Sequence, residues 1–226
     1  AFSEVMKIEK LGDEHFVVHT KEGDYESKMV IWAAGTIAKQ IEAEGEEEYV
    51  GRGISYCAIC DGSFHEKQNV VVIGGGNSAI EEALYLAKIC KKVTIITRGH
   101  HFRADPVLME KVMRANNVDL VTHHVITKFT GKDLLEQVTA KDRDSDNEIV
   151  LNVRGAFIYV GFTPSSTLLE NFDILDEDKY IIVDRNCETK VTGLYAAGDC
   201  IQKNIRQIAT AVADGITCAS AIVRKI

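Results

Sequence analysis

The sequence has no apolar run of the roughly 20 residues that a helix needs to cross a bilayer. Its longest apolar stretch, residues 155–162, has the length of a strand, so we expect no association with a membrane. The chain also has no excess of positive charge, since 26 Lys and Arg residues stand against 34 Asp and Glu residues and give a formal net charge of -8. An acidic chain binds phosphate backbones poorly, so we expect no nucleic acid partner either.

Cysteine is sparse, with six residues among 226, and that is too few for a small scaffold held together by disulfides. No segment that resembles a secretory signal precedes the cysteines, so the expected setting is the reducing cytoplasm. The chain begins at Ala1 and runs almost at once into strand-like segments, as though an upstream part were missing. We therefore expect the sequence to be a fragment of a longer protein.

The composition, with 46% hydrophobic and 27% charged residues, is typical of a globular protein. Strand-like segments near the start, among them residues 16–19 and 29–32, are expected to form hairpins. Five glutamates within residues 42–48 indicate a solvated connection and a domain boundary, and residues 161–164 break the pattern a second time. These boundaries predict three segments, which are residues 1–42, 43–160 and 161–226.

The middle segment contains a strand, a glycine-rich turn and a helix in the order that binds dinucleotides. Apolar residues 70–73 are followed by a G-x-G-x-x-A pattern and a helical run. Gly74 permits the tight turn, Gly76 lets the backbone approach a pyrophosphate, and the small Ala79 allows the helix to pack on the strand. A glycine-rich turn that merely packs is the alternative. The predicted dinucleotide site comprises Gly74, Gly75, Gly76, Asn77, Ser78 and Ala79.

The kind of dinucleotide is decided near the end of the next strand, where an acidic residue binds the ribose of NAD and an arginine accepts the 2′-phosphate of NADP. Residues 97–103 contain no carboxylate. Arg98 and Arg103 favour NADP, with His100 and His101 as lesser candidates. Two arginines near a turn can also be plain surface charge.

Cys57 and Cys60 form a C-x-x-C pair that is followed directly by Asp61, just before the nucleotide-binding strand. Two thiols at this spacing can close and open a small disulfide ring, and the leading thiol can become an activated thiolate. Structural zinc normally needs a second such pair or two spaced histidines. His123 and His124 are adjacent on a predicted strand and so point to opposite faces, and we therefore predict redox chemistry and no metal site.

Five motifs occur in a fixed order and spacing along the chain: residues 51–62, 74–83, 102–105, 193–199 and 206–207. By these motifs the sequence resembles the low-molecular-weight thioredoxin reductases, a family of pyridine nucleotide-disulfide oxidoreductases. The resemblance implies an α/β fold in which a Rossmann-like three-layer NAD(P) domain is inserted into an FAD domain of the same type. The family's first FAD-binding βαβ unit has no counterpart here, which leaves a partial FAD domain.

The resemblance also implies roles for individual residues. Cys60 is then the thiol next to the flavin, Cys57 exchanges with the disulfide of the partner, and Asp61 handles the proton. A positioned carboxylic acid can supply a proton to a leaving thiolate, whereas the alternative reading of Asp61 is a turn residue. For FAD, the resemblance implies contacts with Gly35, Gly198, Asp199, Arg206, Gln207 and Ile208.

The implied activity is that of an NADPH-dependent thioredoxin-disulfide reductase, a cytoplasmic homodimer that uses FAD and NADP. Electrons would pass from NADPH through FAD and the Cys57–Cys60 disulfide to a thioredoxin-like protein. Only Arg98 and Arg103 match the family's 2′-phosphate element, so a relative with another donor or acceptor, such as NADH, a ferredoxin or a peroxide-reducing partner, is an alternative. A catalytically incomplete NAD(P)-binding module is the second alternative.

Overall fold

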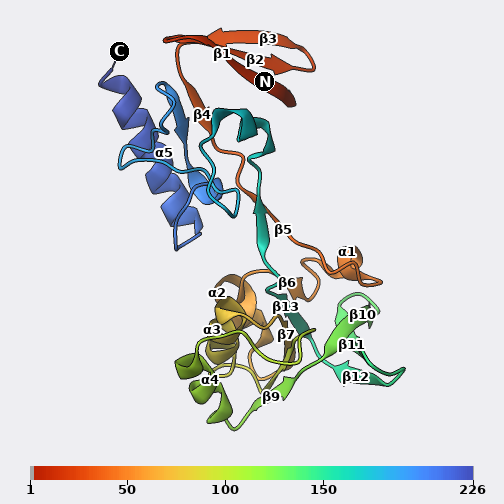
Figure 1. Ribbon diagram of the computed structural model, residues 1–226. Coiled ribbons are helices and arrows are strands. Elements are labelled where there is room, and N and C mark those ends of the chain that lie inside the picture. The colour runs from red at the N-terminus through yellow and green to blue at the C-terminus, as the bar shows by residue number, and fades with distance from the viewer. Residues whose placement is uncertain (1–2, 226) are drawn as a thin grey trace. The chain divides into compact units, whose positions relative to one another are not determined.

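The computed structural model describes residues 3–225, which form two compact units (Figure 1). The central unit comprises Ala38–Gly161, and the split unit comprises the chain up to Ile37 together with the chain from Phe162 onward. Among the described residues, no helix combines the length and the apolar character that crossing a membrane requires.

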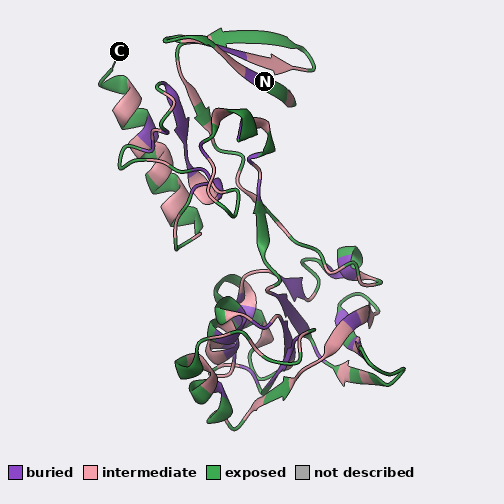
Figure 2. Cartoon of the chain, viewed as in Figure 1, coloured by how far each residue is buried: buried purple, intermediate pink, exposed green. Residues whose placement is uncertain are grey.

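A parallel sheet of five strands forms the middle of the central unit. Three of these strands are short and mostly apolar, as expected for strands that are covered on both faces, and Figure 2 shows them as largely buried. In spatial order the strands are β6 (Ile54–Ser55), β13 (Gly155–Ile158), β7 (Asn69–Ile73), β8 (Lys92–Ile96) and β9 (Val118–Val121).

Alternate residues of β7 enter two different cores, because side chains along a strand point to opposite faces. Val70 and Val72 pack in a core with residues of α3 (Asn77–Leu86) and α4 (Pro106–Met113). Val71 and Ile73 pack in a second core with an antiparallel meander. The meander consists of β10 (His124–Gly131), β11 (Leu135–Asp142) and β12 (Glu148–Asn152). Helices, parallel sheet and meander make three layers, which confirms the predicted α/β class.

Short helices complete the central unit before β7: α1 (Glu46–Tyr49), α2 (Ala58–Asp61) and the 3₁₀ helix η1 (Gly62–His65). Contrary to the expected solvated connection, Glu46 of the acidic stretch is buried, with only 2% of its surface exposed. Its carboxylate accepts hydrogen bonds from the backbone N–H of Ile41 at 3.0 and 3.2 Å. The backbone donor compensates the cost of burying the charge, which charge counting along the sequence could not anticipate.

The split unit is assembled from both ends of the chain. Its first strands, β1 (Val5–Gly12), β2 (His15–Thr20) and β3 (Gly23–Ser27), form an antiparallel sheet. The remaining elements are β4 (Val30–Trp32), β5 (Thr36–Ala38, whose last residue belongs to the central unit), β14 (Phe162–Pro164), η2 (Thr167–Phe172), β15 (Leu194–Ala196), η3 (Gly198–Cys200) and α5 (Ile208–Val223).

Two local predictions are corrected by the strand pairing and the backbone. Residues 29–32 do not form a hairpin strand, because β4 pairs in parallel with β15, and β3 is the hairpin partner of β2. His123 and His124 do not share a strand: His124 begins β10, whereas His123 lies before it with a φ of 59°. The left-handed backbone at His123 breaks the alternation on which the opposite-face argument depended.

Candidate functional site

A disulfide joins Cys57 and Cys60, whose Cα atoms lie 5.3 Å apart. Cys57 is the N-cap residue of α2, and its sulfur accepts a hydrogen bond from the backbone N–H of Cys60 at 3.2 Å. The sulfur of Cys57 thus has a backbone N–H donor within hydrogen-bond distance, and such a donor stabilises a thiolate. Cys60 is exposed and Cys57 is half-buried, so exposure alone does not single out Cys57 as the exchanging thiol.

The carboxylate of Asp61 is held in place by a serine that the sequence analysis did not select. Ser55, buried at the end of β6, donates a hydrogen bond to Asp61 Oδ2 at 2.6 Å. The same hydroxyl oxygen accepts a hydrogen bond from the backbone N–H of Cys57 at 3.1 Å. Ser55 thus links the acid to the backbone of the first cysteine, and only the spatial proximity of β6 and α2 reveals this.

Tyr159 lies at the start of α2, and His65 lies in η1, which follows that helix. Tyr159, which follows β13, accepts a hydrogen bond from the backbone N–H of Ala58 at 2.7 Å, and burial raises the pKa of its hydroxyl. Burial also lowers the pKa of His65, whose ring lies edge-on against Phe157 at 5.5 Å between centroids. The raised pKa of Tyr159 and the lowered pKa of His65 both favour the neutral form, and Tyr159 therefore presents an uncharged hydroxyl to the backbone next to Cys57.

The glycine-rich turn between β7 and α3 has room for a ligand at one residue and none at the two before it. A Cβ atom at Gly74, where φ is +151°, would lie 2.5 Å from the carbonyl oxygen of Tyr159, and a Cβ atom at Gly75 would lie 2.4 Å from Thr97 Oγ1. At Gly76 a Cβ atom would meet nothing within 4 Å. Gly76 is the N-cap of α3 without a side-chain cap, so N–H groups of the first turn remain available to a phosphate.

The next three residues of the turn have different surroundings. Ala79 is buried against the sheet, as the fingerprint requires, and Ser78 is exposed. Asn77 is exposed, but its amide already forms reciprocal hydrogen bonds with Asp105: Nδ2 donates to the carboxylate at 3.0 Å, and Oδ1 accepts from the backbone N–H at 2.8 Å. These bonds connect the start of α4 to the turn and occupy the side chain of Asn77. Asn77 would therefore bind a phosphate through its backbone N–H.

Arg98 and Arg103 both have exposed side chains beyond the carboxyl end of β8. The backbone N–H of Arg103 donates to the carbonyl oxygen of Gly75 at 2.6 Å, which brings that arginine next to the glycine-rich turn. The arrangement puts two cations near a turn that offers N–H groups to a pyrophosphate. It fits the chemistry of NADP, whose additional phosphate attracts arginine.

Glu82 of α3 is a candidate site residue that the sequence analysis did not select. One carboxylate oxygen is buried without a hydrogen bond, and burial, followed by the neighbouring Glu81, raises the pKa of Glu82. The signal that could have identified it is an acidic residue one turn into the helix that follows a dinucleotide turn. A buried carboxylate without a partner is available to a ligand with N–H or O–H donors.

The residues predicted to bind FAD gather in the split unit. Gly35 has a φ of +69° with open space around its Cα, and Gly198 has a φ of +83°. Asp199 Oδ1 is buried without a hydrogen bond, and its nearest cation, Lys203 Nζ, lies 3.8 Å away. An orphaned carboxylate oxygen fits a ligand hydroxyl such as those of the ribityl chain of FAD.

The start of α5 lies beside this carboxylate. The side chain of Arg206 stacks on Tyr180 and donates a hydrogen bond to the carbonyl oxygen of Asp199 at 3.2 Å. Gln207 caps the helix through a reciprocal box with Thr210, and Ile208, the first helical residue, is 84% exposed. The remaining N–H groups of a 16-residue helix face outward here, which suits an electron-rich ring edge.

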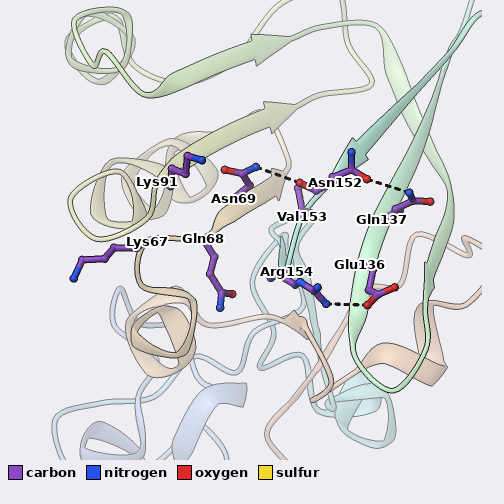
Figure 3. A pocket seen from close by; sticks show the side chains of 9 residues that line it. All are labelled: Lys67, Gln68, Asn69, Lys91, Glu136, Gln137, Asn152, Val153 and Arg154. Carbon is purple, nitrogen blue, oxygen red and sulfur yellow. Dashed lines mark hydrogen bonds and ion pairs between the residues drawn. The ribbon is translucent and has the colours of Figure 1, made fainter.

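A polar cavity of about 450 Å³ lies at the opposite end of the parallel sheet (Figure 3). Asn69, the first residue of β7, lines this cavity. The glycine-rich turn, in contrast, follows Ile73, the last residue of the same strand. Its side chains satisfy one another, as with Gln137 and Asn152 or Arg154 and Glu136. Ligands of parallel α/β sheets bind at the carboxyl ends of the strands, so this cavity is not the dinucleotide site.

Comparisons with known proteins agree with the motifs. Residues 2–215 match the profile of the family described as "Pyridine nucleotide-disulphide oxidoreductase". The chain is 39% identical over 214 residues to the thioredoxin reductase of Bacillus subtilis, a match that covers 93% of this chain and 67% of the relative. It is 36% identical over 217 residues to the thioredoxin reductase of Mycoplasma genitalium, where the match covers 96% of this chain and 69% of the relative.

Among solved structures, the thioredoxin reductase from Streptococcus pyogenes superposes with a TM-score of 0.92 at 37% identity. That superposition covers 98% of this chain and 72% of the other. The chain thus spans about two thirds of the length of the curated relatives.

Proposed function

The chain belongs to the pyridine nucleotide-disulphide oxidoreductases and, within them, to the thioredoxin reductase family, and from this premise we propose that it reduces a thioredoxin-like protein disulfide at the expense of NADPH. The observation that carries the proposal is the Cys57–Cys60 disulfide at the start of α2, in the same unit as the Gly74 turn. The two alternatives, another donor or acceptor and an incomplete binding module, are not favoured by relatives that bear the name thioredoxin reductase.

The overall reaction consumes one hydride from NADPH and one proton from solvent, and the reduced cysteine pair then passes two electrons and two protons to the partner disulfide. When bound, NADPH supplies the hydride and FAD relays its electrons to the disulfide. The thiolate of Cys57 then attacks one sulfur of the partner disulfide and forms a mixed disulfide, and the thiolate of Cys60 attacks Cys57. The Cys57–Cys60 bond forms again, the partner leaves as a dithiol, and Asp61, held by Ser55, delivers a proton to the departing sulfur.

The residues present fit NADP and the part of FAD that comprises the ribityl chain and the ring. For NADP, residues 74–79 would hold the pyrophosphate, and Arg98 and Arg103 would bind the 2′-phosphate. For FAD, Asp199 would accept a ribityl hydroxyl, and Arg206, Gln207 and Ile208 at the start of α5 would face the ring, with Gly35 and Gly198 leaving space. The open surroundings of Gly76 and the orphaned oxygen of Asp199 support these assignments.

The domain assignment follows from these two sites. In this proposal residues 43–160 are the NAD(P)-binding domain with the cysteine pair, and residues 1–42 and 161–226 belong to the FAD domain. The enzyme would act in the cytoplasm as a homodimer. The three-layer architecture of the central unit supports the assignment of the NAD(P)-binding domain, and the sparse cysteine content supports a reducing compartment.

The visible absorption spectrum of the purified protein, followed by addition of NADPH, tests the function. We expect a bound-flavin spectrum that bleaches with NADPH and recovers when a thioredoxin-like disulfide is added. A flavin that bleaches with NADH and not with NADPH would support the alternative donor. A protein that includes the first FAD-binding unit and still stays colourless while it binds NADP would support the binding module and contradict the proposal.

Cofactor preference gives a second prediction. The double replacement Arg98→Ala and Arg103→Ala should weaken NADPH binding by at least about tenfold for each hydrogen bond removed, because a charge-assisted hydrogen bond contributes roughly 1.5–3 kcal/mol. NADH binding should change little, and Kd values from titration of both nucleotides provide the measurement. Arg154→Ala, at the opposite end of the sheet, is the control. Equal losses for NADPH and NADH would mean that the two arginines are plain surface charge.

Exposed apolar side chains beside the disulfide indicate where the partner protein docks. Phe64 is 77% exposed and Ile59 is 59% exposed, and both lie within a few residues of Cys60. Phe64→Ala should raise the KM for the protein substrate roughly tenfold, since burying a large aromatic side chain contributes about 1.5–3 kcal/mol. Turnover of a small aromatic disulfide should not change. Val107→Ala, which removes an exposed apolar residue of α4, is the control, and an unchanged KM in Phe64→Ala would place docking elsewhere.

A further inference from the structure

We propose that His100, His123 and Asp144 form a binding site for a divalent transition metal ion of the zinc class on the central unit. One ligand atom from each side chain lies within 4.8 Å of the others. The residues come from three segments: the turn after β8, the connection between β9 and β10, and the turn between β11 and β12. The proposed reductase chemistry uses neither His123 nor Asp144, and His100 is only a lesser candidate for the 2′-phosphate. The proposal departs from the prediction that the chain has no metal site.

His123 is the fixed member of the cluster. Its backbone adopts a left-handed φ of 59° and its N–H donates to the carbonyl oxygen of Gly99 at 2.9 Å. The side chain is only 13% exposed, and both ring nitrogens are buried without a hydrogen bond, although Nε2 lies 2.9 Å from Asp144 Oδ2. Left-handed backbone at a residue other than glycine costs free energy, and so does burial of Nδ1, which has neither a hydrogen bond nor a charged neighbour. A metal ion bound at one ring nitrogen would offset part of that cost.

His100 is the movable member. Its ring stacks on that of His123, with centroids 3.8 Å apart and planes 12° from parallel. The lone pairs of parallel rings do not meet at one point, so metal binding requires the exposed ring of His100 to turn. Tetrahedral zinc with bonds of 2.0–2.1 Å needs ligand atoms about 3.4 Å apart. Rotation of the exposed side chains of His100 and Asp144 can bring the three ligand atoms from within 4.8 Å of one another to this distance.

The donor set favours a transition metal over other ligands. Two imidazoles with one carboxylate are typical of zinc sites, and three protein ligands leave a fourth position for water. Magnesium and calcium prefer all-oxygen sites, which two imidazoles do not provide. An anion such as a phosphate would be repelled by Asp144, so the cluster is not an extension of the predicted 2′-phosphate site.

Hydrogen bonds connect the cluster to the segment that carries Arg98. Arg143, the neighbour of Asp144, donates from Nη1 to the carbonyl oxygen of Arg98 at 3.2 Å and from its backbone to that of His123 at 3.0 Å. Gly99 accepts from the backbone of His123. A metal bound by His100 therefore restrains the same turn that holds the predicted NADP-selecting arginine.

Calorimetric titration with ZnCl₂ tests the site in a tag-free chain that carries Cys57→Ser and Cys60→Ser, so that the reactive thiols cannot bind the metal; the other four cysteines are buried. We expect one Zn²⁺ per chain. His100→Ala and Asp144→Asn should each weaken binding by at least about tenfold. His101→Ala, the adjacent exposed histidine, should bind as the parent does.

His123→Asn removes the anchor while asparagine tolerates the left-handed backbone, and circular dichroism checks that each variant is folded. Titration with CoCl₂ is the second readout, and an intense visible band typical of four-coordinate Co²⁺ should appear in the parent and vanish in His100→Ala. Absence of saturable Zn²⁺ binding in the parent, or equal affinity in the parent and in His100→Ala, overturns the proposal. Flavin bleaching by NADPH is measured in a separate experiment. It tests the proposed reductase function, whereas the titrations with Zn²⁺ and Co²⁺ test the metal site.

Discussion

Serine at Cys57 or at Cys60 is expected to lower the turnover of a protein disulfide by at least about 10³-fold, because each sulfur takes part in a covalent step that oxygen performs poorly. The bleaching of bound flavin by NADPH should persist in both variants, since hydride transfer to the flavin occurs before the disulfide is reduced. Stopped-flow absorbance measures the flavin step, and thioredoxin-coupled turnover measures the whole reaction. Serine at Cys90, a buried cysteine outside the pair, is the control and should retain turnover.

The same variants decide which cysteine meets the partner. With Cys60→Ser, the remaining thiol of Cys57 should trap a thioredoxin-like protein as a stable mixed disulfide, because no second thiol can release it. With Cys57→Ser, trapping should be at least tenfold weaker, which non-reducing gels measure. Cys60 is the more exposed of the two, so the reverse pattern would exchange the proposed roles. Full turnover in either single variant would contradict the mechanism itself.

Asp61→Asn should slow disulfide turnover by roughly 10²–10⁴-fold, the usual contribution of a positioned general acid. Asparagine keeps the shape of the side chain and can still accept the hydrogen bond that Ser55 donates. A loss of turnover therefore measures the contribution of the proton that Asp61 supplies. Flavin content and the rate of hydride transfer from NADPH should stay close to those of the parent, and the two half-reactions are measured separately by stopped flow.

Two comparisons separate proton transfer from a folding defect. Asp133→Asn changes an exposed acid in a turn of the same unit and should leave both half-reactions intact. Ser55→Ala removes the donor to Asp61 and should lower disulfide turnover less than Asp61→Asn does, because the acid remains but is less well held. Normal disulfide turnover in Asp61→Asn would reduce Asp61 to a turn residue with water as the proton source.

The dinucleotide turn was predictable because its requirements are local. Gly74 needs a backbone that other residues rarely adopt, and Ala79 must be small where helix and strand meet; both demands fall within six residues. The roles of Ser55 and Tyr159 were not predictable, since the hydrogen bonds they make at Asp61 and Ala58 depend on how separate strands are brought together. A lone serine or tyrosine in a sequence carries no such signal.

The errors have the same origin. Residues 29–32 have the composition of a strand, and they form one, but the pairing partner Leu194–Ala196 is remote in the sequence. Glu46 was expected in solvent because its neighbours are acidic, whereas a backbone donor from Ile41 stabilises it in a buried position. At His123 a single left-handed residue changed the face on which a side chain lies. Hydrophobic periodicity and composition predict that a segment forms a strand. They predict neither where the strand is interrupted nor which strands it pairs with.

The pairing of β4 with β15 has a consequence for the order in which the chain folds on the ribosome. The central unit is one continuous segment whose ends are already joined by the hydrogen bond from Lys39 N–H to the carbonyl oxygen of Gly161, so it can fold as soon as Gly161 has emerged. Strand β4, in contrast, is synthesised early and waits for Leu194 with its edge unpaired. An unpaired edge is a template for wrong pairing, so the interval between synthesis of β4 and synthesis of β15 is the one in which the split unit is exposed to it.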